Sequence, residues 1–168
     1  MITTAFKTRS DYLQNPYALP WPLSFHNFSE ALQGGQFATW FKNSVLLTVG
    51  SVTLSTACAA LAAFAVARMR WPGRNVFLSI NVALMVVPPV VMLIPLFIFF
   101  TDLHLVSTYQ GVILIYAGLT LPFSVYLLTN FFRAIPRELI ESALVDGSSN
   151  LGMLVRIILP LSVPALVT

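Results

Sequence analysis

Three long stretches without a charged side chain constrain this chain more than any other feature of its sequence. They cover residues 43–67, 76–100 and 109–132. At a rise of about 1.5 Å per residue, a helix of about 25 residues is about 37 Å long, which exceeds the bilayer's hydrocarbon core of about 30 Å. The sequence therefore predicts three membrane-spanning helices.

The composition excludes a soluble globular domain. Hydrophobic residues make up 57% of the 168 residues, and charged residues make up 9%. A soluble domain carries about 25% charged residues, because its surface has to be wetted by water. Lipid can solvate an apolar surface instead, so we expect an all-α, polytopic membrane protein. The single cysteine, Cys58, lies in an apolar stretch and is expected to be a small buried hydrophobe.

The two ends of the chain are expected to lie outside complete spans. Residues 1–42 mix polar and aromatic side chains, and several prolines break any long helix there, so we expect an extracytoplasmic segment with one short helix near Phe28–Leu32. Residues 157–168 are apolar but too few to cross a bilayer as a helix. They are expected to start a fourth span, which makes the chain a fragment.

Two patterns inside the predicted spans concern helix packing. In the first span, small residues recur at every fourth position and form a face on which another helix can pack closely. These residues are Ser55, Ala59, Ala63 and Ala67. A generic alanine-rich helix remains the alternative. Prolines predict a bent or broken second span and a kink in the third, because they remove backbone hydrogen bonds. They are Pro88, Pro89 and Pro95 in the second span and Pro122 in the third.

Arginine residues predict the orientation in the membrane. The loops at residues 68–75 and 133–156 carry three arginines each, whereas the loop at residues 101–108 carries neither Lys nor Arg. Cytoplasmic loops are enriched in Lys and Arg, so both arginine-containing loops are expected in the cytoplasm. Residues 1–42 then lie outside without a preceding span or a cleavable signal peptide, which indicates a missing upstream helix.

The cytoplasmic loop at residues 133–156 carries a helix pattern of its own. Pro136 suits the first turn of a helix, and Glu138 complements the positive end of the helix dipole. Apolar residues then recur at helical spacing. They are Leu139, Ile140, Ala143 and Leu144. Gly147 is placed to end this helix with a positive φ, and Ser148, Ser149 or Asn150 can cap a second helix that starts near Leu151.

The same loop resembles a known motif. Glu141-Ser142-Ala143 is followed, after three residues, by Gly147 and, after nine more, by Ile157-Ile158-Leu159-Pro160. This spacing resembles the EAA motif of binding-protein-dependent ABC importer permeases, and Ser142 is its one departure, a small residue in place of alanine. The stretches ARMRWPGR, PPVVMLIPLF and LPFSVYLLTNFFRAIPRELIESALVDG are similar to the carbohydrate-uptake, maltose-permease-like branch of that family.

The resemblance implies a permease subunit in the plasma membrane of a prokaryote. The EAA loop of such a subunit forms a coupling helix that docks into a separate ABC ATPase subunit. The further partners implied are a second permease subunit, an extracytoplasmic solute-binding protein and the lipid bilayer, with no nucleic acid. ATP is expected on the ATPase, and no cofactor on this chain. The residues expected to couple to the ATPase are Glu141, Ser142, Ala143, Asp146 and Gly147.

Other functional classes have weaker support in the sequence. No GxxxxGK[ST] loop, metal-ligand spacing or Ser/His/Asp set indicates an enzyme. The three predicted spans contain no acidic residue and no histidine, which argues against a carrier driven by an ion gradient. A small membrane scaffold or channel subunit, or a non-functional truncated permease, remains the alternative.

Four polar residues within the spans are candidates for the solute pathway. Tyr116, Thr120 and Ser124 follow one another at every fourth position and share a helix face, and Asn81 lies in the second span. Their polar groups could bind sugar hydroxyls, or they could join helices to one another. The solute class stays open among carbohydrates, oligosaccharides and polyol phosphates.

Overall fold

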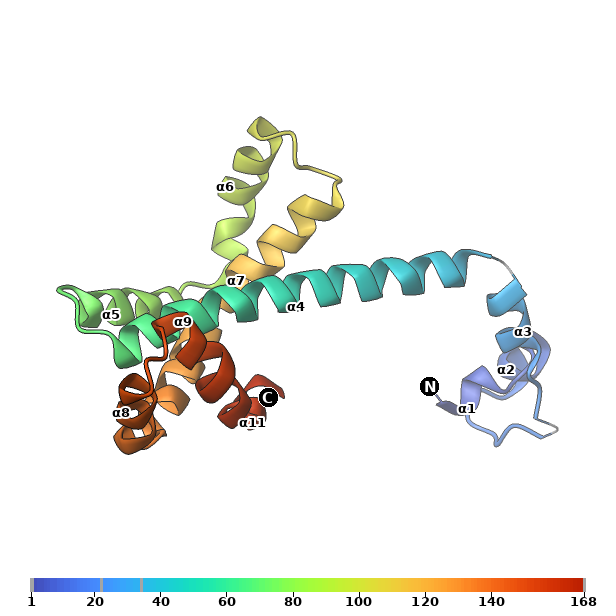
Figure 1. The fold of residues 1–168 in the computed structure, drawn as a ribbon. Coiled ribbons are helices and arrows are strands. Elements are labelled where there is room, and N and C mark those ends of the chain that lie inside the picture. Colours follow the sequence, from blue (N-terminus) through green and yellow to red (C-terminus); the bar gives the residue numbers. More distant parts are fainter. Residues whose placement is uncertain (1, 22, 34, 168) are drawn as a thin grey trace. The chain divides into compact units, whose positions relative to one another are not determined.

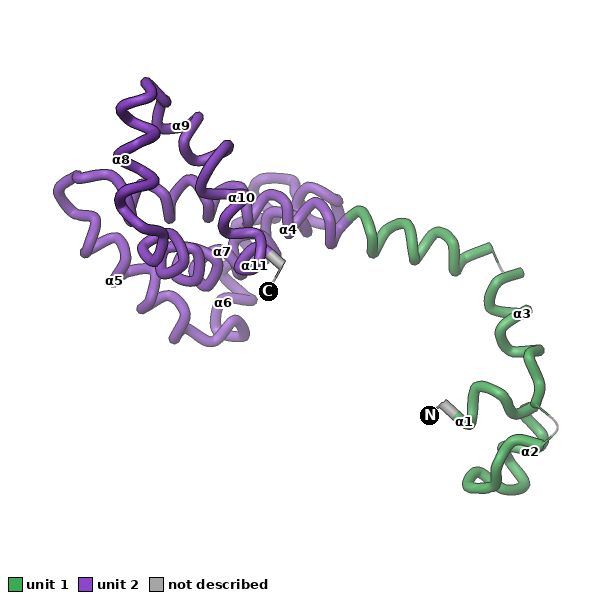
Figure 2. The backbone as a smooth tube through the Cα atoms, turned by 60° about the horizontal axis from the view of Figure 1, so that its bottom comes forward, with its two compact units in different colours: residues 1–46 green, residues 47–168 purple. Residues whose placement is uncertain are grey.

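The computed structural model describes residues 2–21, 23–33 and 35–167. Every regular element in these ranges is a helix (Figure 1). The chain divides into two compact units, residues 1–46 and residues 47–168 (Figure 2). The predicted all-α fold is therefore confirmed.

The first unit is built from three short helices and the start of a fourth. The short helices are α1 (Ile2–Ala5), α2 (Arg9–Gln14) and α3 (His26–Gln33), and α3 confirms the short helix expected near Phe28–Leu32. The ring of Phe6 contacts those of Phe25 and Phe28.

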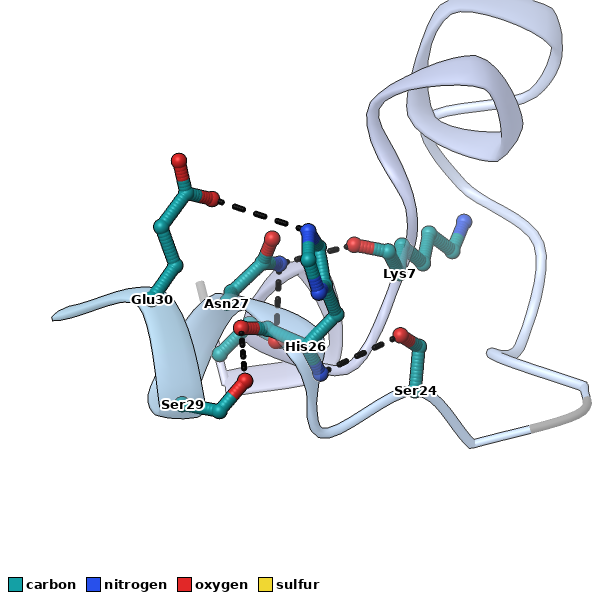
Figure 3. Close-up of polar contacts among 7 residues, drawn as sticks. Lys7, Ser24, His26, Asn27, Ser29 and Glu30 are labelled. Carbon is teal, nitrogen blue, oxygen red and sulfur yellow. Dashed lines mark hydrogen bonds and ion pairs between the residues drawn. The ribbon is translucent and has the colours of Figure 1, made fainter. Parts of the chain in front are cut away.

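The side chain of Lys7 holds the chain around these helices. Lys7 is 4% exposed, and its Nζ donates hydrogen bonds to the carbonyls of Asn15, at 2.7 Å, and Pro16, at 3.3 Å. Asn27 on α3 donates in turn to the carbonyls of Ala5 and Lys7, as the dashed lines in Figure 3 show. Backbone carbonyls, rather than a carboxylate, therefore surround the buried ammonium group.

Helix α4 (Gln36–Arg68) is longer than the first predicted span, which begins at residue 43. The seven residues before residue 43 contain neither Gly nor Pro, so the helix continues through them although they are less apolar. The small-residue face predicted on this helix is confirmed, because Ser55, Ala59 and Ala63 are buried and Ala67, which is half-buried, packs against the same core. Cys58 lies on the exposed side of the helix, so its expected burial is wrong.

The second predicted span is broken into two helices. Helix α5 (Arg74–Leu84) and helix α6 (Pro89–Asp102) are bent by 101° relative to each other. Pro88 has an extended backbone, with ψ of 130°, and Pro89 starts α6, where its missing N–H leaves no hydrogen bond unmade. The predicted break at these prolines is confirmed. Pro95 lies inside α6 without ending it.

The third predicted span lies within helix α7 (Tyr109–Ala134), which continues through Pro122. Thr108 caps its start, because the Thr108 side chain accepts a hydrogen bond from the N–H of Gly111 at 3.0 Å. A side chain at Gly111 would place its Cβ 2.1 Å from the carbonyl oxygen of Leu105, so the loop before α7 needs glycine there.

Helices α4 and α7 are both long and apolar enough to cross a membrane, and the bent pair α5 and α6 would make a third span if it counts as one. The remaining helices follow α7 in the C-terminal part of the chain. They are α8 (Arg137–Val145), α9 (Asn150–Met153), the π-helix η1 (Leu154–Ile158), α10 (Leu159–Leu161) and α11 (Val163–Val167). The helical segment therefore begins at Asn150, seven residues before the expected start of a fourth span.

The core of the second unit joins all of these C-terminal elements to α4 and α7. It contains Ala59 and Ala63 of α4, Val125 and Phe132 of α7, and Ala143 of α8, each at most 4% exposed. Further buried members come from α9, η1 and α11. They are Met153, Leu154, Ile158 and Ala165. Helix α8 is therefore packed against the membrane helices and is not a free loop.

We expect Ala63→Leu to destabilise the protein, because Ala63 is fully buried and a larger side chain would force the helices apart. Overpacking of this kind costs about 1–3 kcal/mol. Thermal unfolding of the purified protein in detergent measures the effect. Ala57→Leu is the matched control, since Ala57 lies on the exposed side of the same helix. Equal melting temperatures for the two variants would contradict the packing described here.

Candidate coupling site

Helix α8 begins directly after the proline that the sequence places in its first turn. Pro136 was expected in the first turn, but it is the N-cap, with φ of −54° and ψ of 139°, and Arg137 is the first helical residue. The residue before a proline is disfavoured in the α conformation, so Ile135 is extended and α7 ends there. Glu138 lies in the first turn of α8, where its charge favours the helix dipole.

The two sides of α8 differ in burial. Ala143 is 4% exposed and Ile140 packs against the same core. The other two members of the predicted apolar stripe, Leu139 and Leu144, are 44% and 53% exposed. Val145, at the end of the helix, is 87% exposed. The core thus covers half of the predicted stripe and leaves a mixed apolar and charged side uncovered.

A tight turn at Gly147 ends α8. The N–H of Gly147 donates to the carbonyl of Leu144 at 3.0 Å, and the N–H of Ser148 donates to that of Ala143 at 2.9 Å. This pair of hydrogen bonds is the Schellman motif, which satisfies the free carbonyls at the end of a helix. It requires a left-handed residue, and Gly147 has φ of 76°. The positive φ predicted for Gly147 is confirmed.

A second cap follows directly after the turn. The side chain of Ser149 accepts a hydrogen bond from the N–H of Gly152 at 3.1 Å and caps α9. Among the three candidate capping residues, the structure therefore selects Ser149. The end of α8 and the start of α9 are thus each fixed by a defined cap, at Gly147 and at Ser149, with only Ser148 between them.

The structure divides the predicted coupling residues into two sets. Ala143 is buried in the core, so its small size serves packing. Glu141, Ser142 and Asp146 are exposed together with Gly147. The hydroxyl of Ser142 donates to the carbonyl of Leu139 at 3.1 Å, so its difference from the motif's alanine is accommodated within the helix itself. The coupling role of these residues stays a prediction.

Arg68 belongs to this site, although the sequence indicated it only as a cytoplasmic charge. Its Nη2 donates hydrogen bonds to the carbonyl of Phe132 and, at 2.7 Å, to that of Ile135. Both carbonyls lie at the end of α7, directly before α8. Nothing in the local sequence pairs Arg68 with these residues, which follow it by 64 and 67 positions.

The four pathway candidates do not form one cluster. The hydroxyl of Thr120 donates to that of Ser55 on α4 at 2.9 Å, which joins two helices. The hydroxyl of Ser124 donates to the carbonyl of Thr120, and Tyr116 is 56% exposed. Asn81 is 7% exposed and donates to the carbonyl of Phe77 within α5. Thr120 therefore acts as a contact between helices, and a role in solute binding stays a prediction.

Two apolar hollows, of about 440 and 560 Å³, lie between α6 and α7. Aliphatic and aromatic side chains line most of both, with Ser107 at the second, and none of the four pathway candidates lines either hollow. The walls of these two hollows, as far as the structure describes them, therefore offer few groups that could hydrogen-bond to a polar solute.

Comparison with known proteins identifies the family. Residues 29–168 match the family described as binding-protein-dependent transport system inner membrane component. The chain belongs to this family.

Individual relatives agree with this assignment. The chain is 40% identical to a putative ABC transporter permease protein, ORF2, of Caldicellulosiruptor, over all of this chain and 61% of that protein. It is 41% identical to the alpha-glucoside transport system permease protein AglG of Rhizobium meliloti, over 83% of this chain and 38% of that protein.

A solved structure has the same fold. It is a bacterial ABC transporter involved in the import of the acidic polysaccharide alginate, with a TM-score of 0.84 and 26% identity, over 99% of this chain and 58% of that chain. The chain thus spans about 60% of the length of the first of these relatives and of the chain in this structure.

We expect Gly147→Ala to loosen the end of α8, because an L-residue in the left-handed conformation costs about 1–2 kcal/mol. An added Cβ would meet no atom within 4 Å, so the cost comes from the backbone alone. Gly118→Ala is the matched control, since its Cβ also has open space but its backbone is helical. Hydrogen exchange at the amide of Ser148 should speed up by about tenfold in Gly147→Ala. Equal exchange in the two variants would contradict the assigned turn.

Proposed function

We propose that this chain is part of the membrane-spanning permease subunit of an ATP-driven solute importer and that α8 couples it to a separate ATPase subunit. One observation carries the proposal. Helix α8 is fixed on one side by Ala143 in the core and ended by the Schellman turn at Gly147, while Glu141 on its other side is exposed.

The packing of α8 suits a helix that receives force from a partner. Its buried side belongs to the same core as Ala63 of α4 and Phe132 of α7, so a displacement of α8 would be passed to both membrane helices through this core. Its exposed side offers the apolar Val145 beside the carboxylates of Glu138 and Glu141.

The solute is proposed to be a sugar or a related polyol. The relative from Rhizobium meliloti is named for alpha-glucoside transport, and the structural relative takes part in the import of a polysaccharide. These relatives support a carbohydrate for this chain, without deciding which one.

The remaining parts of such an importer are proposed to be other chains. They are the ATPase that binds ATP, a second permease subunit and an extracytoplasmic solute-binding protein, and the family description itself refers to a binding protein. The complete protein would lie in the inner membrane of a prokaryote and cross it several times. The loops at residues 68–75 and 133–156 would face the cytoplasm, as their arginines predict.

We expect Glu141→Ala and Gly147→Val to leave the complete protein in the membrane but to weaken its association with the ATPase. Loss of a partly desolvated charged pair at an interface reduces affinity by about tenfold or more. Gly147→Val changes the direction of α8 through its positive φ. Retention of the ATPase on the detergent-solubilised complex and solute uptake are the two measurements.

Glu30→Ala is the control for loss of a carboxylate, because Glu30 lies in the first unit and its side chain is 75% exposed. It should retain the ATPase and take up solute normally. Normal retention and uptake in Glu141→Ala and Gly147→Val would refute the coupling role of α8.

Cysteine labelling tests the orientation. In a Cys58→Ser background, Arg70→Cys should react with a membrane-impermeant maleimide only from the cytoplasm, and Asp102→Cys only from outside. Both residues are exposed, so the reagent can reach them once it is on the correct side. Reaction of position 102 from the cytoplasm would show that the proposed topology is inverted.

A further inference from the structure

Arg68 connects three helix ends that are far apart in the sequence. It is the last residue of α4, and its guanidinium group binds the carbonyls of Phe132 and Ile135. Ile135 is the C-cap of α7, and the next residue, Pro136, is the N-cap of α8. One side chain therefore fixes the end of α4 to the residue pair from which α8 begins.

The chemistry of this contact explains why an arginine stands there. The last carbonyls of a helix lack the N–H partner found along the rest of the helix, and a cation near them also favours the helix dipole. The carbonyl of Phe132 accepts the N–H of Ile135 at 3.4 Å in addition to Arg68. Both hydrogen bonds come from Nη2, whose two N–H groups lie in the fixed plane of the guanidinium group, whereas an ammonium group is a compact point charge on a flexible stem. The Nε–H of Arg68 is buried without a hydrogen bond in the described part of the chain. The only ion pair among the described residues joins His26 and Glu30, so carbonyls rather than a carboxylate hold Arg68.

The neighbouring arginine shows that cytoplasmic charge alone does not explain the contact. Arg70 lies two residues further on and is exposed. In the part of the chain that the structure describes, its side chain has no hydrogen bond and no ion pair. Both arginines contribute equally to the positive charge of the loop. Arg68 alone of the two reaches across to the end of α7.

We infer that Arg68 is a positioning residue for coupling: it makes α4, the end of α7 and the start of α8 move together when the ATPase displaces α8. This inference rests on the proposed function of α8. Without the contact, Ile135 and Ala143 would be held to α4 only through their packing on the shared core. A displacement of α8 would then reach α4 through this packing alone, and less well.

The test uses the complete protein assembled with its second permease subunit, ATPase and binding protein in lipid nanodiscs. The variants are Arg68→Met, which keeps the length of the stem but removes the donors, and Arg68→Lys, which keeps the charge. Arg70→Met is the matched control, because it removes the same charge from the same loop. At equal amounts of assembled complex, three quantities are measured: retained ATPase, basal ATP hydrolysis, and hydrolysis stimulated by solute-loaded binding protein.

Arg68→Met should retain the ATPase within about twofold of the unmodified complex. Its stimulation by loaded binding protein should fall about tenfold or more, because the free energy of a hydrogen bond to a charged group corresponds to an equilibrium factor of that order. Arg68→Lys should recover part of the stimulation, and Arg70→Met should behave as the unmodified complex. Unchanged stimulation in Arg68→Met would overturn the inference. A fall in assembled amount and melting temperature with an unchanged ratio of stimulated to basal hydrolysis would show a structural role alone and would also overturn it.

The same preparation separates this inference from the proposed function. Gly147→Val is assayed beside the Arg68 variants. If Gly147→Val loses the ATPase while Arg68→Met stimulates normally, the coupling role of α8 stands and the role of Arg68 fails. If Gly147→Val and Glu141→Ala both retain the ATPase and stimulate normally, the coupling role of α8 itself fails.

Discussion

The side-chain core shared by α4, α7 and the C-terminal helices is the interaction on which this part of the larger unit depends. Ala59 and Ala63 are fully buried, and together with Val125 and Phe132 they belong to one core. Within a bilayer, lipid tails are as apolar as the side chains, so association relies on close van der Waals packing and small residues. Larger side chains on this face of α4 would separate the helices and remove the surface against which α8 packs.

Local features of the candidate site could be predicted from the sequence, because short-range chemistry determines them. Gly147 supplies the left-handed residue that ends α8, and Ser149 supplies a side-chain acceptor for the next helix. The break at Pro88 and Pro89 is local for the same reason. Helix α4 starts seven residues before the predicted span, since the apolar stretch marks where lipid is expected and not where helical hydrogen bonding begins.

Features that depend on distant residues could not be predicted. The partners of Arg68 follow it by 64 and 67 positions, and no periodic pattern connects them. The exposure of Leu139 and Leu144 is another case, because an apolar stripe does not reveal which neighbour covers it. The hydroxyl of Thr120 could have faced solute or another helix, and only the fold brings Ser55 of α4 within 2.9 Å of it, in addition to the carbonyl of Tyr116 on its own helix.

The wide turn at Leu154–Ile158 affects how the end of this chain is compared with its relatives. A π turn holds one residue more than an α turn, so a helical wheel drawn through this segment assigns the residues on one side of the turn to the wrong face. Pro160 follows the turn closely and has no N–H to donate. A homologue with one residue fewer here would contain a regular helix and keep the same faces on both sides. A single-residue gap at this place in an alignment would therefore record a change of helix type, with the buried surface conserved.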